Sequence, residues 1–463
     1  MNVVEQMKKF IEPKSVALIG VSRRTGGLAF NILENLLDYG YQGKVYPINP
    51  NAAEILGIRA YSSVREVPEE IDLAVINLPR SLVPGIVGEC VEEGIESIVI
   101  VTQGFADADD EEGKQLQKQI DNIIKGKARI LGPNTFGTAN PHICFNTAFA
   151  EVKMSKIPIG LVCQTGLFFE GLRDLSLLGK AIDLGNACDV GFTDALEYFE
   201  QDDQTKVIGL HIEGMRDATR FFKVAKRVAC KKPIIVLKTG KGEKAAHAAQ
   251  SHTGSLVGKD EIWNVAFKQS GIMRVSDLDE FADTVKAFCS LPLMQGRKIA
   301  ILTGSGAAGI MGIDACEKFG LELAQLSSTT GERLNALSPS WQSLSNPTDY
   351  WPSVMVEKHP IFQVGATFVN NLLDDIEVDA LLYILTVMPS LSIELRQFVE
   401  RVTMNYSNKP LVFFVWGDIF DEVKDELEKT GRTVVFPSPD RAIKTLAHLA
   451  DYAEFRKSQS QAY

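Results

Sequence analysis

The sequence has no apolar run long enough to cross a membrane. Its longest uncharged apolar stretch is Ala380–Met388, well short of the roughly 20 residues that a membrane-spanning helix needs. The N-terminal segment MNVVEQMKKFIEPK carries interspersed charges and lacks the continuous apolar core of a secretory signal. We therefore expect a cytoplasmic protein with no membrane partner.

Cysteine and positive charge are both scarce. The chain has 7 cysteines, an odd number, and none of them forms a CxxC pair, which predicts neither a metal site nor a disulfide framework. Lys and Arg number 48 against 59 Asp and Glu, and the net charge is −11. This balance disfavours broad contact with nucleic acid. Phosphate-bearing ligands would need local binding sites.

One local pattern occurs three times in the 463 residues. Each copy is a short apolar run, then Gly, Ser or Thr, then an amphipathic segment, which is the strand, turn and helix of an open parallel sheet. Because the copies lie roughly 140 residues apart, an ordinary domain size, each copy predicts one α/β domain. The copies are Ser15–Gly27, Ile159–Gly166 and Lys298–Gly309.

The predicted fold class is therefore α/β, with three tandem open parallel-sheet domains. Further buried-strand runs alternate with helical segments such as Asp109–Lys125, as they do in parallel sheets. Pro and Gly accumulate near residues 153–158 and 290–297 and mark the joints between domains. The expected domains are residues 1–153, 154–292 and 297–463.

The first glycine turn is a candidate phosphate site. It departs from the GxGxxG fingerprint because Ser22 stands where the second glycine would be, and the next strand ends in Asn49 where NAD binding would need an acidic residue. A nicotinamide dehydrogenase is thus disfavoured. Positive charge from Arg23 and Lys44 suits a heavily phosphorylated nucleotide such as coenzyme A. A turn that serves only strand–helix packing is the alternative.

Three more loops of this domain follow predicted strands, where open α/β sheets bind their ligands. They contain Pro79, Gly104 and Asn134, although a Gly-Pro-Asn turn also forms without any ligand. The candidate coenzyme A residues are Gly20, Ser22, Arg23, Gly27, Lys44, Asn49, Pro79, Gly104 and Asn134.

His252 differs from the other five histidines because it lies in a long segment rich in Gly, Ala, Ser and Lys after the strand run Pro233–Leu237. An exposed imidazole is mostly neutral at pH 7 and therefore nucleophilic. Two features support a phosphohistidine: Gln164-Thr165-Gly166 opens a helix whose amides could grip a phosphate, and Glu213 ends a strand where it could hold the ring N–H. A surface histidine and an ordinary strand-end carboxylate are the alternatives.

Eight motifs along nearly the whole chain form a characteristic set. They are SVALIGVS, KVYPINPN, GPNTFGTANP, CQTG, LGNACDVGFTDALEYFEQDDQTKVIGLHIEG, KTGKGEKAAHAAQSHTGS, ILTGSGAAG and SNPTDY. Together they resemble the α subunit of the ADP-forming acyl-CoA synthetases, the acetate–CoA ligase type related to succinyl-CoA synthetase.

This resemblance implies a Rossmann-like CoA-binding domain followed by two flavodoxin-like ligase domains. It implies that acyl-CoA and phosphate give an acyl phosphate, which phosphorylates His252, and that His252 passes the phosphoryl group to ADP, with Glu213 as the supporting carboxylate. The implied phosphate-holding residues are Gln164, Thr165, Gly166, Gly304, Ser305 and Gly306.

The resemblance also implies partners for this chain. Its ligands would be coenzyme A, phosphate and a small carboxylic acid or acyl-CoA, while ADP or ATP with Mg²⁺ would bind an ATP-grasp β subunit in an α2β2 assembly. No metal is expected on this chain itself. The alternative function is a noncatalytic CoA-binding regulator or scaffold of the same fold.

Overall fold

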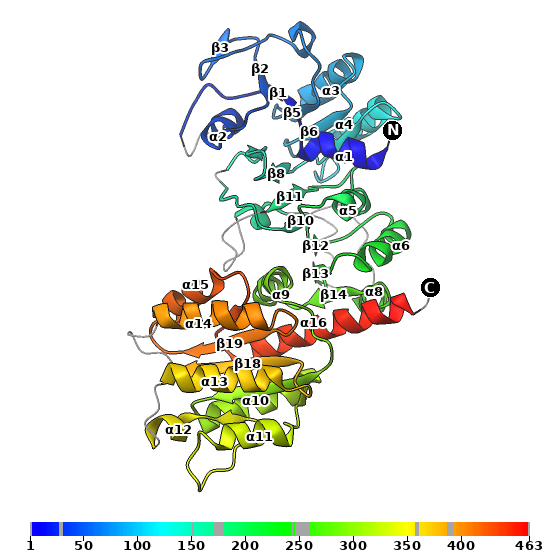
Figure 1. The fold of residues 1–463 in the computed structure, drawn as a ribbon. Coiled ribbons are helices and arrows are strands. Elements are labelled where there is room, and N and C mark those ends of the chain that lie inside the picture. Colours follow the sequence, from blue (N-terminus) through cyan, green and yellow to red (C-terminus); the bar gives the residue numbers. More distant parts are fainter. Residues whose placement is uncertain are drawn as a thin grey trace. The chain divides into compact units, whose positions relative to one another are not determined.

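The apolar runs of the sequence form the buried strands of three main sheets in the part of the chain that the structure describes (Figure 1). The computed structural model describes residues 2–26, 31–150, 152–170, 179–242, 244–245, 260–356, 361–386 and 392–461. It divides into two compact units, Met1–Ala282 and Asp283–Tyr463.

The first sheet is a parallel sheet of five strands in the order β2-β1-β5-β6-β7. Most residues of these strands are buried, as is usual for a parallel sheet that is covered on both faces. The strands are β1 Ser15–Ile19, β2 Lys44–Ile48, β5 Leu73–Ile76, β6 Ser97–Ile100 and β7 Arg129–Leu131. The helical elements are α1 Val3–Ile11, α2 Ile32–Asp38, η1 Val64–Glu66, η2 Arg80–Leu82, α3 Val83–Glu92 and α4 Glu111–Ile124, and a short hairpin comprises β3 Glu54–Ile55 and β4 Ile58–Arg59.

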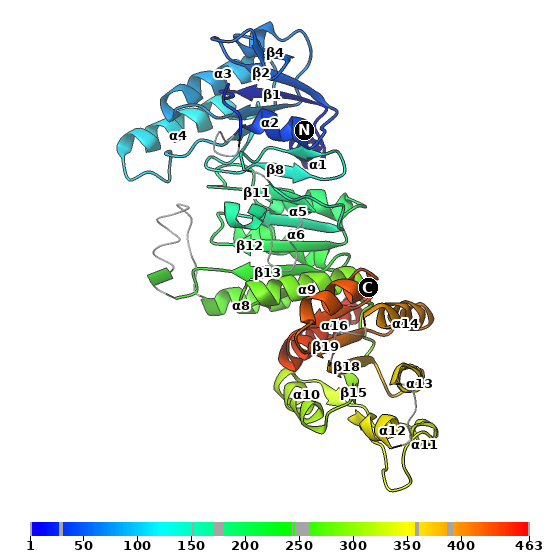
Figure 2. The same ribbon diagram turned by 90° about the vertical axis from the view of Figure 1, so that its left-hand side faces the viewer.

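The second sheet has seven strands in the order β14-β13-β12-β10-β11-β8-β9. Figure 2 shows it beside the first sheet within the same unit. The strands are β8 Thr138–Asn140, β9 Phe145–Asn146, β10 Ile159–Cys163, β11 Lys180–Asp183, β12 Val207–Ile212, β13 Ile234–Lys238 and β14 Ile272–Val275. The helical elements are η3 Gly166–Glu170, α5 Phe192–Gln201, α6 Ala218–Ala229, α8 Asp260–Gln269 and α9 Leu278–Ser290.

The strands β8 and β9 lie in the second sheet although they precede residue 154 in the sequence. β8 pairs antiparallel with β11 and with β9, whereas the other strand pairs of this sheet that the structure describes are parallel. Two side chains of β8 hold the end of α1: Thr138 Oγ1 donates to the Phe10 carbonyl (2.7 Å) and Asn140 Nδ2 donates to the Ile11 carbonyl (3.0 Å). The segment after the Gly-Pro-Asn turn thus connects the first sheet to the second.

The third sheet, in the second unit, is parallel and has the order β16-β15-β18-β19-β20, with β17 paired to β15. Side chains alternate between its two faces: Leu381 and Tyr383 enter one core, and Leu382 and Ile384 enter the other. The strands are β15 Lys298–Thr303, β16 Glu322–Leu323, β17 Thr348–Asp349, β18 Ala380–Thr386, β19 Leu411–Trp416 and β20 Val434–Phe436. The helices are α10 Gly306–Phe319, α11 Ser328–Asn335, α12 Trp351–Met355, α13 Ile361–Asp374, α14 Ser392–Asn405, α15 Phe420–Glu428 and α16 Pro439–Ser460.

The predicted α/β class with mostly parallel sheets is confirmed. Each of the three predicted strand–turn–helix copies begins with a parallel strand, namely β1, β10 and β15. Among the described residues, no helix combines the length and the apolar character that a membrane span requires.

Candidate functional site

The turn after β1 forms a small pocket at the carboxyl edge of the first sheet. Gly20 has a φ of 89°, and a Cβ at this position would lie 2.2 Å from the Asn77 carbonyl oxygen, so no other residue fits without a shift of the backbone. Gly20, Ser22 and Asn77 line a cavity of about 100 Å³. A close approach of backbone to ligand is what a phosphate-binding turn requires.

Two hydrogen bonds connect this turn with the segment after β2, and both involve candidate coenzyme A residues. Asn49 Nδ2 donates to the Val21 carbonyl of the turn (3.3 Å), and Arg23, in the turn, donates to the Asn51 carbonyl (3.4 Å). Gly27 lies outside the described residues.

Lys44 lies at the other edge of the sheet. It is the first residue of β2 and pairs with Ser15, the first residue of β1, whereas the Gly20 turn follows the last residue of β1. The Lys44 ammonium forms an ion pair with Glu69 instead. The structure therefore does not bring Lys44 to the turn.

Pro79 and Gly104 lie at the carboxyl edge, and the side chain of Arg80 joins their two loops. Arg80 follows Pro79 directly and donates to the Gly104 carbonyl (3.0 Å). The same guanidinium forms ion pairs with Asp110 (2.8 Å) and Glu112 (2.7 Å), and these carboxylates raise its pKa through their hydrogen bonds and charges. Arg80 belongs to one of the loops that follow predicted strands, but the sequence offered no reason to count it among the candidate site residues.

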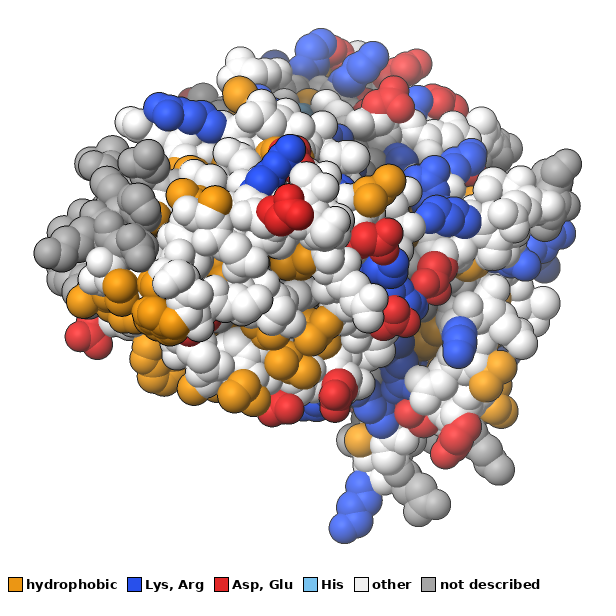
Figure 3. Space-filling model, turned by 60° about the horizontal axis from the view of Figure 1, so that its bottom comes forward, with side chains coloured by type: hydrophobic (Ala, Val, Ile, Leu, Met, Phe, Trp, Pro, Cys, Tyr) orange, Lys and Arg blue, Asp and Glu red, His pale blue; other side chains and the backbone are white. Residues whose placement is uncertain are grey.

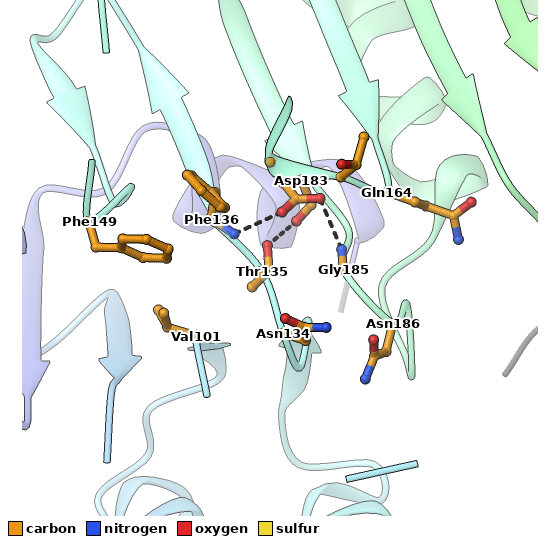
Figure 4. Close-up of a pocket in the computed structure, with 11 residues that line it drawn as sticks. Val101, Asn134, Thr135, Phe136, Phe149, Gln164, Asp183, Gly185 and Asn186 are labelled. Atoms are coloured by element: carbon orange, nitrogen blue, oxygen red, sulfur yellow. Dashed lines mark hydrogen bonds between the residues drawn. The ribbon is translucent and has the colours of Figure 1, made fainter. Parts of the chain in front are cut away.

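A second pocket, of about 130 Å³, brings residues of both sheets together. Asn134, from the Gly-Pro-Asn turn after β7, and Gln164, Thr165 and Gly166, after β10, all line it (Figure 4). One predicted coenzyme A residue and three predicted phosphate residues therefore share one pocket.

The bulky residues after Gly166 pack into the protein core. Phe168 and Phe169 are almost fully buried, whereas Leu167 is exposed. Phe168 stacks on the His211 ring, with the centroids 4.9 Å apart, and Phe169 packs on Phe136. These side chains fix the turn in place and leave the backbone of Gln164-Thr165-Gly166 at the pocket.

Hydrogen bonds on two sides hold the backbone of Glu213, at the end of β12. Gln164 Oε1 accepts the Glu213 N–H (2.9 Å) and the Gly214 N–H (3.2 Å). On the other side, Lys238 Nζ donates to the Glu213 carbonyl (2.7 Å) and to the Thr239 carbonyl. Burial lowers the pKa of Lys238 to about 8. The structure thus connects the Gln164 side chain with the backbone of Glu213.

Asp183, the last residue of β11, lies in the wall of the same pocket and is 1% exposed. Its carboxylate accepts the N–H of Phe136 (2.8 Å) and of Gly185 (3.2 Å). Burial raises the pKa of Asp183 to about 6 in spite of these bonds. Both Asp183 and Lys238 are charged residues that end apolar strand runs, and that signal could have found them in the sequence.

His252 and the segment around it lie outside the described residues. Among the described histidines, His211 on β12 is 4% exposed, its Nε2 lies 3.2 Å from Thr239 Oγ1, and burial lowers its pKa to about 4. His211 is therefore a neutral core residue at pH 7.

The Gly304–Gly306 turn lies in the second unit, between β15 and α10. Ser305 is the N-cap of α10, and its N–H donates to Thr303 Oγ1 (3.0 Å). A Cβ on Gly304 would lie 3.8 Å from the ring of Trp351, which is exposed.

Figure 3 shows hydrophobic side chains gathered on one part of the surface that this view presents. The exposed large hydrophobic residues of α10 and α12 are Ile310, Met311, Trp351 and Met355.

In the part of the chain that the structure describes, no group of three or more His, Cys, Asp or Glu side chains is arranged to hold a metal ion. The pockets instead offer backbone amides, side-chain amides and hydroxyl groups, which are donors suited to phosphate and carboxylate oxygens.

The family models and relatives that match this chain are named for CoA binding or CoA ligation. Residues 14–141 match the family described as CoA binding domain, and residues 156–288 match the family described as succinyl-CoA ligase like flavodoxin domain. Acetate–CoA ligase (ADP-forming) II of Archaeoglobus fulgidus is 34% identical over 98% of this chain and 68% of its own length. The α subunit of acetate–CoA ligase (ADP-forming) I of Pyrococcus furiosus is 34% identical over 98% of this chain and 99% of its own length.

A solved structure is also similar over nearly the whole chain. It is the dinucleotide forming acetyl-coenzyme A synthetase 1 of Ca. Korarchaeum cryptofilum, in complex with phosphate and ADP. The TM-score is 0.88 at 28% identity, with 98% of each chain covered.

Proposed function

The chain belongs to the family of ADP-forming acetate–CoA ligases, the ADP-forming acyl-CoA synthetases, and we propose that it performs this chemistry through a phosphohistidine at His252. The reaction interconverts acyl-CoA, ADP and phosphate with the carboxylic acid, CoA and ATP. The observation that carries the proposal is the pocket shared by Asn134 and Gln164–Gly166, in which Gln164 also holds the backbone of Glu213.

Coenzyme A would bind along the carboxyl edge of the first sheet. Gly20 and Ser22 would approach its phosphates, because the turn has no Cβ at Gly20 and opens onto a cavity. Asn49, Arg23, Pro79 and Gly104 border the same edge, and Asn134 lies where that edge meets the second sheet. The donors at the turn fit an anionic, phosphorylated nucleotide.

The proposed relay breaks one bond and forms one in each step. A phosphate oxygen attacks the thioester carbonyl carbon, and the C–S bond breaks to release CoA. The imidazole of His252 then attacks the phosphorus of the acyl phosphate, and the carboxylate leaves. Gln164, Thr165 and Gly166 would stabilise the phosphoryl oxygens, and the Glu213 carboxylate would hold the imidazole N–H that does not react.

For the transfer of the phosphoryl group to ADP we propose a second polypeptide. The Pyrococcus relative is named as an α subunit, which supports a separate partner for this chain. We propose an ATP-grasp β subunit that binds the nucleotide with Mg²⁺, in an α2β2 assembly, and the Gly304–Gly306 turn of this chain as the other phosphate-holding helix start. Light scattering of the copurified complex should give the mass of two copies of each chain.

The test is the site of phosphorylation. The chain is incubated with acetyl-CoA and labelled inorganic phosphate, and peptides are analysed without acid, because phosphohistidine is acid-labile. The label should be on His252, and it should disappear in His252→Ala while CoA affinity is unchanged. His247→Ala, a histidine of the same segment, is the matched control and should keep the label. Glu213→Gln should reduce labelling without abolishing it.

Two results would contradict the relay. One is a phosphoryl group on Thr165, on Ser255 or on another histidine. The other is steady turnover by His252→Ala. CoA binding without any labelling would instead favour a noncatalytic CoA-binding regulator.

A further inference from the structure

Lys238 is a buried cation to which the relay described above gives no role. It is the last residue of β13 and is 1% exposed. Its Nζ donates to the Glu213 carbonyl at the end of β12 (2.7 Å) and to the Thr239 carbonyl, and it lies over the Trp263 ring, 5.5 Å from the centroid. A buried ammonium group is costly unless hydrogen bonds and aromatic faces surround it, so these three contacts fix its position.

The contacts of Lys238 lie at both ends of the part of the chain that carries His252. Thr239 is the first of residues 239–259, named here the His252 segment, and α8, which contains Trp263, follows this segment directly. One side chain therefore touches the residue at which the segment begins and the helix that comes after it.

Thr239 is anchored to the neighbouring strand β12. Its N–H donates to the Ile212 carbonyl (3.1 Å), and its Oγ1 lies 3.2 Å from Nε2 of the buried His211 ring. The bond from Lys238 to the Thr239 carbonyl adds a third contact. The chain therefore leaves β13 from a fixed point beside the end of β12.

The backbone of Glu213 is held on both sides by side chains from neighbouring strand ends. Gln164 Oε1 accepts its N–H (2.9 Å), and the Lys238 ammonium group donates to its carbonyl (2.7 Å). Because both peptide groups are held, the direction of the Glu213 Cα–Cβ bond is set. A carboxylate that holds an imidazole N–H needs such support, since hydrogen bonds weaken with small changes in distance and angle.

We propose that Lys238 is a positioning residue of the relay, whose ammonium group holds Glu213 and the start of the His252 segment in the arrangement in which Glu213 reaches the imidazole. The inference deepens the phosphohistidine function proposed above and rests on it. Lys238 does not touch the phosphoryl group in this scheme and acts only through the two carbonyl groups that it holds.

The positive charge of Lys238 is part of this role. Hydrogen bonds from an ammonium group are stronger than those from a neutral amine, and burial lowers the pKa of Lys238 to about 8. The clamp is therefore tight below this pH and loosens above it.

Several charged or titratable groups surround this ammonium group. The two carboxylates raise its pKa, the two other cations lower it, and the imidazole, with a pKa of about 4, stays neutral near pH 8. They are Glu213 at the end of β12, Asp260 on α8, Arg274 on β14, Lys241 after β13 and His211 on β12.

The experiment measures the rate at which the full chain becomes labelled on His252 from acetyl-CoA and labelled inorganic phosphate, between about pH 6.5 and about pH 9.5. Wild type is compared with Lys238→Met, which has a similar length and no charge. All other titrating groups are common to the two proteins, so the ratio of their rates reports on Lys238. The ratio should be about tenfold or more at pH 7 and should fall at least about threefold as the pH rises through 8.

Lys238→Arg separates charge from packing. Its guanidinium group stays charged over the whole range, so this variant should label faster than Lys238→Met by a ratio that does not change with pH. If Lys238→Met does not fold, the ratio of wild type to Lys238→Arg should still fall as the pH rises through 8. Lys223→Met, at an exposed position of α6, is the matched control and should label like the wild type at every pH.

Failure of this proposal differs from failure of the relay. Label on His252 with a pH-independent ratio of wild type to Lys238→Met would overturn the positioning role and leave the relay in place. A loss of CoA affinity in Lys238→Met would also overturn it, because the lysine would then support the whole unit. Wild type without label on His252 would refute the relay, and the role of Lys238 with it.

Discussion

Asp183 should make the stability of the first unit depend on pH. Its carboxyl group is 1% exposed, and burial raises its pKa from 3.8 to about 6. The folded chain therefore holds this proton more tightly than the unfolded chain. The contribution of this carboxyl group to the free energy of unfolding is fully present below pH 3.8 and is lost as the pH rises through about 6.

The size of this effect follows from the two pKa values. A tenfold change in proton affinity corresponds to about 1.4 kcal/mol, so the full contribution is about 3 kcal/mol. Between about pH 4.5 and about pH 7.5 the expected loss in the free energy of unfolding is about 2 kcal/mol, because at the lower pH the unfolded carboxyl is already mostly ionised. Asp183→Asn, which carries no charge at either pH, should lose this component.

The assay follows urea unfolding by the fluorescence of Trp263, the tryptophan of the first unit. The other three, Trp341, Trp351 and Trp416, are exposed and are replaced by Phe in every protein compared. The parent protein and its Asp183→Asn variant share all other titrating groups. The difference between their free energies of unfolding at each pH therefore isolates the effect of this carboxyl group. Parallel pH profiles for the two proteins would refute the reasoning.

Two further predictions follow from the same unit. Gly20→Ala should reduce CoA affinity at least tenfold by calorimetry, because its Cβ would lie 2.2 Å from the Asn77 carbonyl oxygen; unchanged affinity would remove this turn from the CoA site. Lys180→Met should lower the free energy of unfolding by about 3–5 kcal/mol, because the 2% exposed Lys180 ammonium pairs with Glu12 (3.1 Å) and Asp202 (2.9 Å). Urea unfolding measures this loss, and a change below about 1 kcal/mol would contradict it.

Local patterns in the sequence determined the fold class and the family. Strand–turn–helix copies depend on residues that are neighbours in the chain, and apolar runs such as Ala380–Leu385 predict buried strands wherever they occur. The structure confirms that run as β18 and the segment Asp109–Lys125 as the helix α4. The joint presence of the eight motifs also determined the resemblance, which the comparisons confirm.

The site residues were harder to evaluate from the sequence. His252 and Gly27 stay predictions, as do the roles of Glu213 and Gly304–Gly306. Lys44 shows why spacing alone misleads: it is close in sequence to Asn49, yet the two residues lie at opposite ends of the same strand run, and only Asn49 meets the Gly20 turn. A parallel strand separates its ends by its whole length.

What the sequence determined by itself is the order of the strands along the chain and the chemistry available in their turns, because both depend on adjacent residues. Only the tertiary structure decided which turns meet. It brought Asn134, Gln164 and the buried Asp183 into the wall of one pocket, and it left the side-chain nitrogens of Gln164 and Asn186 without a hydrogen-bond partner among the described residues. These contacts join residues far apart in the chain, and sequence periodicity carries no information on such pairs, because pairing across sheets is set by packing of the whole unit.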